Sequence, residues 1–274
     1  MDKNHNTDMI NSFIIDHIGT ETTKTTPIEL LTLLKQKFNL KRKAFNLILN
    51  NLVSENILEY SNDYGRTFIE ISYSKPVKIS DHVIIKPPQI RYKNNPDEIV
   101  VTIETGTSFG RGTHPTTRLS INCIDTVLHK QRGCLSGKKA LDIGTGSGIL
   151  SLTGALFGIG YTDACDIDSV SLNEAVKNAK INNCEKKILF SDSFNGNIKY
   201  DFIFANLRFP TLIDLIPQIS EMAKKDSYVI FSGIKVEEKE KVIQKYANEN
   251  FQIINERSEK GWAAIILKKN DLKK

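Results

Sequence analysis

The chain has 274 residues, of which 40% are hydrophobic and 25% are charged, an ordinary composition for a globular protein. Its net charge of +5 is too small to indicate nucleic-acid binding, so we expect a lysine-rich solvated surface. No apolar run approaches the roughly 20 residues of a membrane span, and the polar first residues do not resemble a signal peptide, so we expect a cytoplasmic protein without membrane contact.

Residues 1–75 predict a small, mainly helical domain. Apolar residues at helical spacing, with Thr26 and Pro27 as a helix start, predict helices over 9–18, 27–38 and 41–58. The third helix is expected to bury Phe45, Leu47, Ile48, Leu52 and Val53. An alternating segment that turns near 62–65 then predicts a β-hairpin, and three helices followed by a β-ribbon resemble a winged helix.

Residues 76–104 contain four prolines and predict a linker with short strands, one of them over 82–86. A polar helix is expected next, over 115–131. Its start, Thr113-His114-Pro115, indicates that Thr113 caps the helix and that Pro115 occupies its first turn. A single histidine in such a loop is most often packed or solvated.

From residue 105 to 274 the sequence predicts an α/β domain. Strands are expected over 138–143, 161–166, 187–192, 200–206 and 227–233, and helices over 147–157, 169–181, 211–223 and 236–248. Two further strands flank a turn at 259–261. Such alternation predicts a mainly parallel, seven-stranded sheet with helices on both faces and a terminal β-hairpin.

A glycine loop follows the first of these strands, in the sequence LDIGTGSG (141–148). A sharp turn from strand to helix leaves backbone N–H groups unpaired, and Gly144, Gly146 and Gly148 allow a ligand to approach the main chain. A dinucleotide fold requires a small residue where Ile149 stands. The pattern D-x-G-x-G-x-G instead resembles the cofactor loop of class I S-adenosylmethionine methyltransferases; another nucleotide or a purely structural turn remain alternatives.

Carboxylates follow the first three strands of this domain. Asp166, about 20 residues beyond the glycine loop, is placed to bind ribose hydroxyls. Asp168 either assists it or caps the next helix. Asp192 accepts from the adenine amino group or belongs to a turn. Asp142 either faces an ammonium group of the cofactor or bonds to nearby backbone.

Several stretches, in order, resemble the ribosomal protein L11 methyltransferase family: FGRGTHPTTRLSI, LDIGTGSGILS, DIDSVSLNEAVKNAKIN, FANLRFPTLIDLIPQIS and the closing GWAAIILKK. The resemblance runs from about residue 77 to the end. It implies the class I methyltransferase fold, S-adenosylmethionine as cofactor and a loop around Thr113 folded over its methionine part. Asn206 would lie beside the transferred methyl group and orient an incoming amine, the alternative being a strand-end cap. The candidate cofactor-binding residues are Thr113, Asp142, Gly144, Gly146, Gly148, Asp166, Asp192 and Asn206, with Asn206 also the candidate catalytic residue.

The chain departs from the family pattern at two arginines and at its N-terminus. Arg111 stands where the family has a small residue, and Arg208 stands where it is typically apolar. An extra cation there would disfavour a protonated lysine or bind an acidic substrate. Residues 1–75 replace the family's αβ substrate-docking domain, so ribosomal protein L11 is a possible but insecure substrate.

The sequence therefore predicts a methyltransferase that acts on a protein lysine or amino terminus. One alternative is a small-molecule N- or O-methyltransferase whose N-terminal domain forms a homodimer. Another is a DNA-binding regulator that senses S-adenosylmethionine, suggested by the basic residues 41–43. Acidic and basic residues nearly balance over 1–85, which argues against nucleic acid as a partner. Four cysteines without a C-x-x-C pair predict no metal site.

Overall fold

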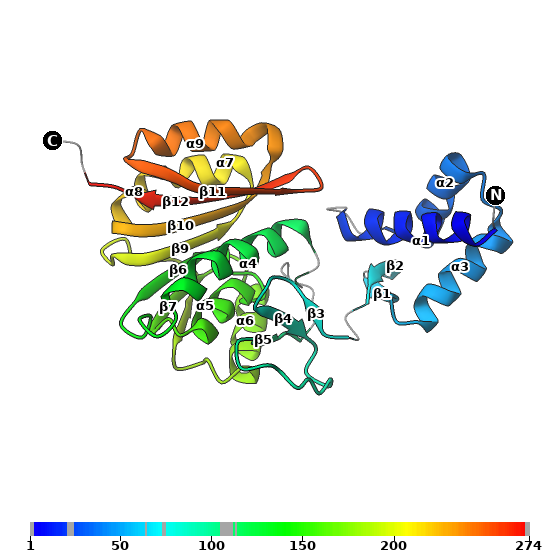
Figure 1. The fold of residues 1–274 in the computed structure, drawn as a ribbon, viewed down its shortest axis with the longest axis horizontal. Coiled ribbons are helices and arrows are strands. Elements are labelled where there is room, and N and C mark those ends of the chain that lie inside the picture. The colour runs from blue at the N-terminus through cyan, green and yellow to red at the C-terminus, as the bar shows by residue number, and fades with distance from the viewer. Residues whose placement is uncertain are drawn as a thin grey trace. The chain divides into compact units, whose positions relative to one another are not determined.

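The computed structural model describes residues 3–20, 25–63, 65–72, 75–104, 112 and 114–271. The chain divides into two compact units, Met1–Lys75 and Pro76–Lys274, each with a hydrophobic core of its own (Figure 1). Within the described ranges no helix combines the length and apolar character that a membrane crossing requires.

The first unit contains three helices and a two-stranded antiparallel hairpin: α1 (Lys3–Thr20), α2 (Pro27–Phe38), α3 (Arg42–Ser54), β1 (Leu58–Asp63) and β2 (Arg66–Ile71). Helix α2 begins as predicted, because Thr26 caps it and forms a capping box with Glu29. Thr25 adds an isolated antiparallel bridge to Ile69 of the hairpin. Three helices with a β-ribbon agree with the sequence expectation, and the winged-helix assignment stays a prediction.

The predicted apolar stripe of α3 is wrong at one position. Leu47 is 64% exposed, whereas Leu49 is buried together with Phe45, Ile48 and Leu52. Residues 45, 48, 49 and 52 follow the i, i+3, i+4, i+7 spacing of one helix face, which residue 47 does not share. The helix also ends at Ser54, before the expected residue 58.

The second unit is built on a seven-stranded sheet in the order β11-β12-β10-β9-β6-β7-β8. Its strands are β6 (Lys139–Ile143), β7 (Tyr161–Cys165), β8 (Ile188–Ser191), β9 (Tyr200–Asn206), β10 (Ala223–Lys235), β11 (Phe251–Glu259) and β12 (Trp262–Lys269). Strands β8, β7, β6, β9 and β10 are parallel, whereas β12 is antiparallel to both β10 and β11. The predicted mainly parallel sheet with a terminal hairpin is confirmed.

Helices cover both faces of this sheet (Figure 1). They are α4 (Pro115–Leu128), α5 (Ile149–Phe157), α6 (Ser169–Ile181), α7 (Phe209–Asp214), α8 (Ile216–Met222) and α9 (Lys239–Ala247), with short 3-10 turns η1 (His129–Gln131) and η2 (Val236–Glu238). In β9, Phe202 and Phe204 pack in the core beneath α4 and α5, while Ile203 and Ala205 pack against α7–α9. Because successive side chains of a strand point to opposite faces of the sheet, β9 contributes to the hydrophobic cores on both faces.

The segment 76–104 belongs to this unit and is not a free linker. It forms a three-stranded sheet from β3 (Val77–Lys78), β4 (Val83–Lys86) and β5 (Ile99–Thr102). Val83, Ile85 and Val101 are buried in the same core as α4 and α5. Its hydrophobic residues therefore help to form the core on the α4 and α5 face of the seven-stranded sheet, despite the surrounding prolines.

Two predicted helices differ in detail from the structure. The expected helix over 211–223 is divided into α7 and α8, because Pro217 in the first turn of α8 lacks an N–H and would clash inside a continuous helix. The helix expected to be polar, α4, is mostly buried, including Thr116, Thr117 and Asp125. The buried hydroxyl of Ser120 bonds to a backbone carbonyl one turn earlier, its Oγ donating to Thr116 O at 2.9 Å.

Candidate active site

The candidate site lies at the carboxyl edge of the sheet, between β6 and β9, where the strand order reverses. Strand β6 ends at Ile143 and runs through the glycine loop into α5, and β9 ends at Asn206. In open α/β sheets this switch point is where ligands bind, because the two neighbouring loops diverge there.

All three glycines of the loop require left-handed backbone, with φ of +73° at Gly144, +54° at Gly146 and +83° at Gly148. At Gly144 and Gly148 a neighbouring side chain also lies so close that a Cβ would crowd it. A Cβ on Gly144 would lie 2.5 Å from Leu207 Cδ2, and one on Gly148 would lie 3.1 Å from the Cβ of Ala175 in α6. The loop is therefore held tightly between α6 and the residue after Asn206.

The loop amides are not unpaired, contrary to the sequence expectation. Gly144 N and Thr145 N both donate to Cys165 O at 2.9 Å, and Gly148 N donates to Thr145 O at 2.9 Å. Gly146 N donates to Asp166 Oδ2 at 2.8 Å. The end of β7 thus supplies the acceptors that fix the turn.

Asp142 is fully buried beneath the loop. Its Oδ2 accepts from Thr145 Oγ1 at 2.7 Å, Ser151 Oγ at 2.7 Å and Ser151 N at 3.1 Å. Burial raises the pKa of this carboxyl to about 6, against the lowering effect of the Ser151 and Thr145 hydrogen bonds. Its other oxygen, Oδ1, is buried without a hydrogen-bond partner among the described residues. One oxygen organises the loop, and the second keeps its capacity to accept a hydrogen bond.

Asp166 and Asp168 have separate tasks after β7. Asp166 holds Gly146 N with one oxygen and accepts from Asp168 N with the other at 3.0 Å. A carboxylate offers about four lone-pair sites, so both oxygens retain the capacity to accept ribose hydroxyls. Asp168 caps α6 by accepting from Val170 N, Ser171 N and Ser171 Oγ, as one of the two sequence interpretations predicts.

Of the remaining cofactor candidates, Asp192 makes no hydrogen bond to the glycine loop within the described part of the chain. Asp192 lies just after β8, is exposed and accepts from Ser193 Oγ at 3.0 Å. Thr113 and Arg111 fall outside the described residues. The predicted cap of α4 is wrong: His114, and not Thr113, is the N-cap, and its Nδ1 accepts from Thr116 N at 3.3 Å.

Asn206 ends β9 directly beside the glycine loop. Its Oδ1 is buried and has no hydrogen-bond partner among the residues described. The next residue, Leu207, donates its N–H to Ser232 O on β10 at 3.1 Å and contacts Gly144. A buried amide oxygen without a partner is costly unless a ligand supplies the donor. This fits an orienting role better than a strand-end cap, which would bond to nearby backbone.

An aromatic and basic cluster, which we call the Trp262 cluster, adjoins this strand end. Lys235 Nζ lies 3.9 Å and Arg208 Cζ 5.1 Å from the centroid of the Trp262 indole. The ring of His114 meets the indole edge-to-face at 5.4 Å. Burial, followed by the charges of Arg118 and Lys235, lowers the pKa of His114 to about 4, so this histidine is neutral at pH 7.

Sequence reasoning missed the Trp262 cluster, because its members come from four distant elements. Arg208 was singled out alone, whereas Lys235 at the end of β10 and Trp262 at the start of β12 are register partners. They pair between β10 and β12, which are antiparallel neighbours in the sheet and are not the two strands of the predicted terminal hairpin. The placement of β12 beside β10, and its register, were the missing information.

Comparison with known proteins places this architecture in a family context. The family model described as ribosomal protein L11 methyltransferase (PrmA) matches residues 61–270. A ribosomal protein L11 methyltransferase of Thermoanaerobacter pseudethanolicus is 34% identical over 201 residues, covering 72% of this chain and 62% of that protein. One of Caldanaerobacter subterraneus is 29% identical over 229 residues, covering 83% and 71%.

Solved structures agree with these sequence matches. A ribosomal protein L11 methylase from Lactobacillus delbrueckii subsp. bulgaricus aligns with a TM-score of 0.62 and 28% identity, covering 73% of this chain and 100% of that one. A methyltransferase from Pyrococcus furiosus, at 19% identity and a TM-score of 0.51, shares the fold. Residues 1–60 lie before the segment that the family model matches.

Proposed function

Because the chain belongs to the ribosomal protein L11 methyltransferase family, we propose that it transfers the methyl group of S-adenosylmethionine to an amino nitrogen of a protein. Family membership makes it an S-adenosylmethionine-dependent methyltransferase. The observation that carries the proposed acceptor is the buried Oδ1 of Asn206 at the switch point of the sheet, which has no hydrogen-bond partner in the described part of the chain. That oxygen can accept an N–H of a neutral amine and so direct its lone pair.

The residues around the loop fit the cofactor. The Oδ1 of Asp142 would receive the ammonium of its amino-acid end, and Asp166 would receive the ribose hydroxyls. The bound cofactor supplies a methyl group already activated by the positive sulfonium. The protein then has to place the acceptor nitrogen in line with the S–CH₃ bond and exclude water. Such positioning can lower the activation free energy of a reaction by roughly 7–11 kcal/mol.

The acceptor amine must also be neutral. For a lysine with a pKa of about 10.4, deprotonation at pH 7 costs about 4.6 kcal/mol, against about 1 kcal/mol for an α-amino group. Arg208 and Lys235, both at the Trp262 cluster, add positive charge close to the strand end that carries Asn206. Nearby cations lower the pKa of an incoming amine, so they favour the reactive neutral form.

The substrate is tested with the purified full-length chain and S-adenosylmethionine labelled in the methyl group. We expect label to enter a protein when ribosomal proteins, including L11, are supplied, and to enter it about 10²–10³-fold more slowly with Asn206→Ala. Hydrolysis of the labelled band then separates side-chain methyl-lysine from a methylated amino terminus. Label found only in a solvent-soluble metabolite contradicts a protein substrate and supports the small-molecule alternative.

Arg208 is expected to select acceptors by charge. Its side chain is exposed and lies over Trp262, two residues after Asn206. Replacement Arg208→Gln should raise KM about threefold to fivefold for a peptide with an acidic residue beside the acceptor, as removal of one partly exposed ion pair predicts. The Kd of S-adenosylmethionine should not change. The exposed Arg91→Gln serves as control, and an equal KM change for a neutral peptide would show that charge is not the cause.

Cofactor affinity is expected to depend on the ionisation of Asp142. Its pKa, raised to about 6 by burial, lies above the unfolded value, so the protonated form is favoured in the folded protein and the unliganded chain loses stability as pH rises from about 4 to 6. An ammonium ligand prefers the carboxylate, so affinity should fall up to about tenfold per pH unit below about 6.

Calorimetric titration with S-adenosylmethionine between pH 5 and 7.5 measures this dependence. Asp142→Asn should bind more weakly at pH 7.5 and show little pH dependence, whereas the exposed Asp214→Asn should follow the wild type. A wild-type affinity that is constant across this range would contradict the assignment of Asp142 to the ammonium.

A further inference from the structure

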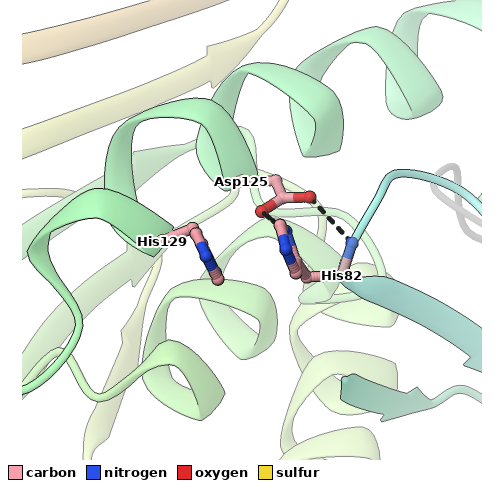
Figure 2. A group of neighbouring side chains, drawn as sticks. All are labelled: His82, Asp125 and His129. Atoms are coloured by element: carbon pink, nitrogen blue, oxygen red, sulfur yellow. Dashed lines mark hydrogen bonds and ion pairs between the residues drawn. The ribbon is translucent and has the colours of Figure 1, made fainter. Parts of the chain in front are cut away.

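Three side chains gather at the C-terminal end of α4, far from the glycine loop: His82, Asp125 and His129 (Figure 2). Asp125 and His129 are one helical turn apart, and His82 directly precedes β4. Helix α4 separates them from His114 at its other end by about 20 Å, at 1.5 Å per residue. In the ranges that the structure describes, this is the one group of three or more potential metal ligands within 4.8 Å of one another.

Asp125 joins the helix to the three-stranded sheet. Its Oδ1 lies 2.9 Å from His82 Nδ1, and its Oδ2 accepts from His82 N at 3.1 Å. The Asp125 side chain is only 6% exposed, against 28% for His82. The carboxylate is therefore fixed by two contacts to one residue, and each of its oxygens keeps a further lone pair.

The position of His129 has no such explanation. Its ring stacks on that of His82, with centroids 3.6 Å apart and planes inclined by 9°. Its Nδ1 is buried without a hydrogen-bond partner among the described residues. A buried ring nitrogen without a partner is costly, and a neutral imidazole nitrogen is a metal ligand.

We propose that His82, Asp125 and His129 bind one divalent transition-metal ion, with Zn²⁺ the best match to two imidazole nitrogens and a carboxylate oxygen. Ligands four residues apart on a helix lie on one face, as metal-binding pairs on helices do. A water molecule would complete a four-coordinate site. The expectation from cysteine spacing alone, that no metal binds, did not consider these residues.

The ligand atoms need only a small rearrangement. Bonds of about 2.0–2.1 Å in a tetrahedral site place neighbouring ligand atoms about 3.3 Å apart. Here the separations are all within 4.8 Å, so none contracts by more than about 1.5 Å, and the 2.9 Å between His82 Nδ1 and Asp125 Oδ1 opens slightly. The parallel rings must turn about χ2, a broad torsion, until their in-plane lone pairs meet. If His82 ligates through Nδ1, the proton on that nitrogen is released to solvent as the ion takes its place.

The ion would stabilise the fold and take no direct part in methyl transfer, because it is remote from Asn206. It links α4 to β4, segments separated by 43 residues in the sequence. Both elements bury side chains in the core shared with α5. We therefore expect the ion to raise thermal stability and to leave the chemistry of the acceptor site unchanged.

The test uses the tag-free full chain, stripped of metal and titrated with Co²⁺ and with Zn²⁺. We expect one ion per chain by calorimetry, visible d–d absorption typical of nitrogen–oxygen-coordinated Co²⁺, and displacement of Co²⁺ by Zn²⁺. At about a hundredfold excess of Zn²⁺ over Kd, the Tm should rise by about 5–10 °C.

His129→Gln is the diagnostic variant, because it leaves the contact between Asp125 and His82 intact. It should weaken metal binding more than about tenfold and reduce the rise in Tm to about half or less at the same Zn²⁺ concentration. His17→Gln, which replaces a histidine stacked on Phe13 in α1, is the matched control and should bind like the wild type. A wild type without stoichiometric Co²⁺ binding, or equal binding by His129→Gln, would overturn the proposal. The wild-type titration decides the question even if a variant fails to fold.

Discussion

Asn206→Ala is expected to lower kcat by about 10²–10³-fold while changing the Kd of S-adenosylmethionine by less than about threefold, in line with the loss of one orienting group in an active site. The Oδ1 of Asn206 is buried and has no hydrogen-bond partner among the described residues, so its removal disturbs no contact of its own in the fold. The substitution should therefore remove mainly the hydrogen bond that orients the acceptor amine.

Steady-state kinetics with the labelled protein substrate and calorimetry with the cofactor separate the two effects. Asn197→Ala, at an exposed position before β9, is the matched control and should retain wild-type kcat. If Asn206→Ala lowers cofactor affinity and kcat in parallel, the residue binds the cofactor and does not orient the acceptor. Unchanged turnover would show that Asn206 has no role in the active site.

Gly233→Ala is expected to destabilise the second unit by about 3–5 kcal/mol, the combined cost of left-handed backbone and overpacking. A Cβ at Gly233, where φ is +84°, would lie 2.4 Å from Leu207 O, 2.8 Å from Leu207 C and 3.0 Å from Leu207 N. These are backbone atoms that cannot rotate away. Because Leu207 follows Asn206, the forced shift should also lower kcat.

Gly261→Ala gives a matched comparison, because it has a similar φ of +78° but nothing within 4 Å of its would-be Cβ. It should cost only the left-handed strain of about 1–2 kcal/mol and leave kcat unchanged. Urea unfolding and kcat of the two variants measure the difference. Equal destabilisation by both would show that backbone strain alone, and not the contact with Leu207, makes Gly233 necessary.

Local signals predicted most of the second unit. Helix α6 begins and ends where the sequence indicated, because Asp168 caps it and its apolar face follows helical periodicity. The prediction of strand β9 is likewise correct at both ends, since its apolar residues alternate between the cores on the two faces of the sheet. The glycine loop was found for a similar reason: its sequence pattern is contained within eight consecutive residues, although the partners that hold it lie elsewhere.

Features that depend on distant partners were missed. Burial of the hydroxyl-rich helix α4 depends on the sheet formed by residues 76–104 and on the hairpin at the chain's end. The contact of His82 with Asp125 spans 43 residues, and the Trp262 cluster combines residues from both ends of the second unit. Periodicity and spacing carry no information about such pairs.

The hydrogen bonds that fix the glycine loop have a consequence for ligand exchange. Four of its amides already donate to acceptors within the protein, so the turn is ordered before the ligand binds. Binding of the cofactor therefore does not have to pay the conformational entropy of ordering this turn. Substrate nucleoside and demethylated product should then enter and leave without remodelling this turn. Discrimination between the two must come from groups near the sulfur, which is the part of the molecule that differs.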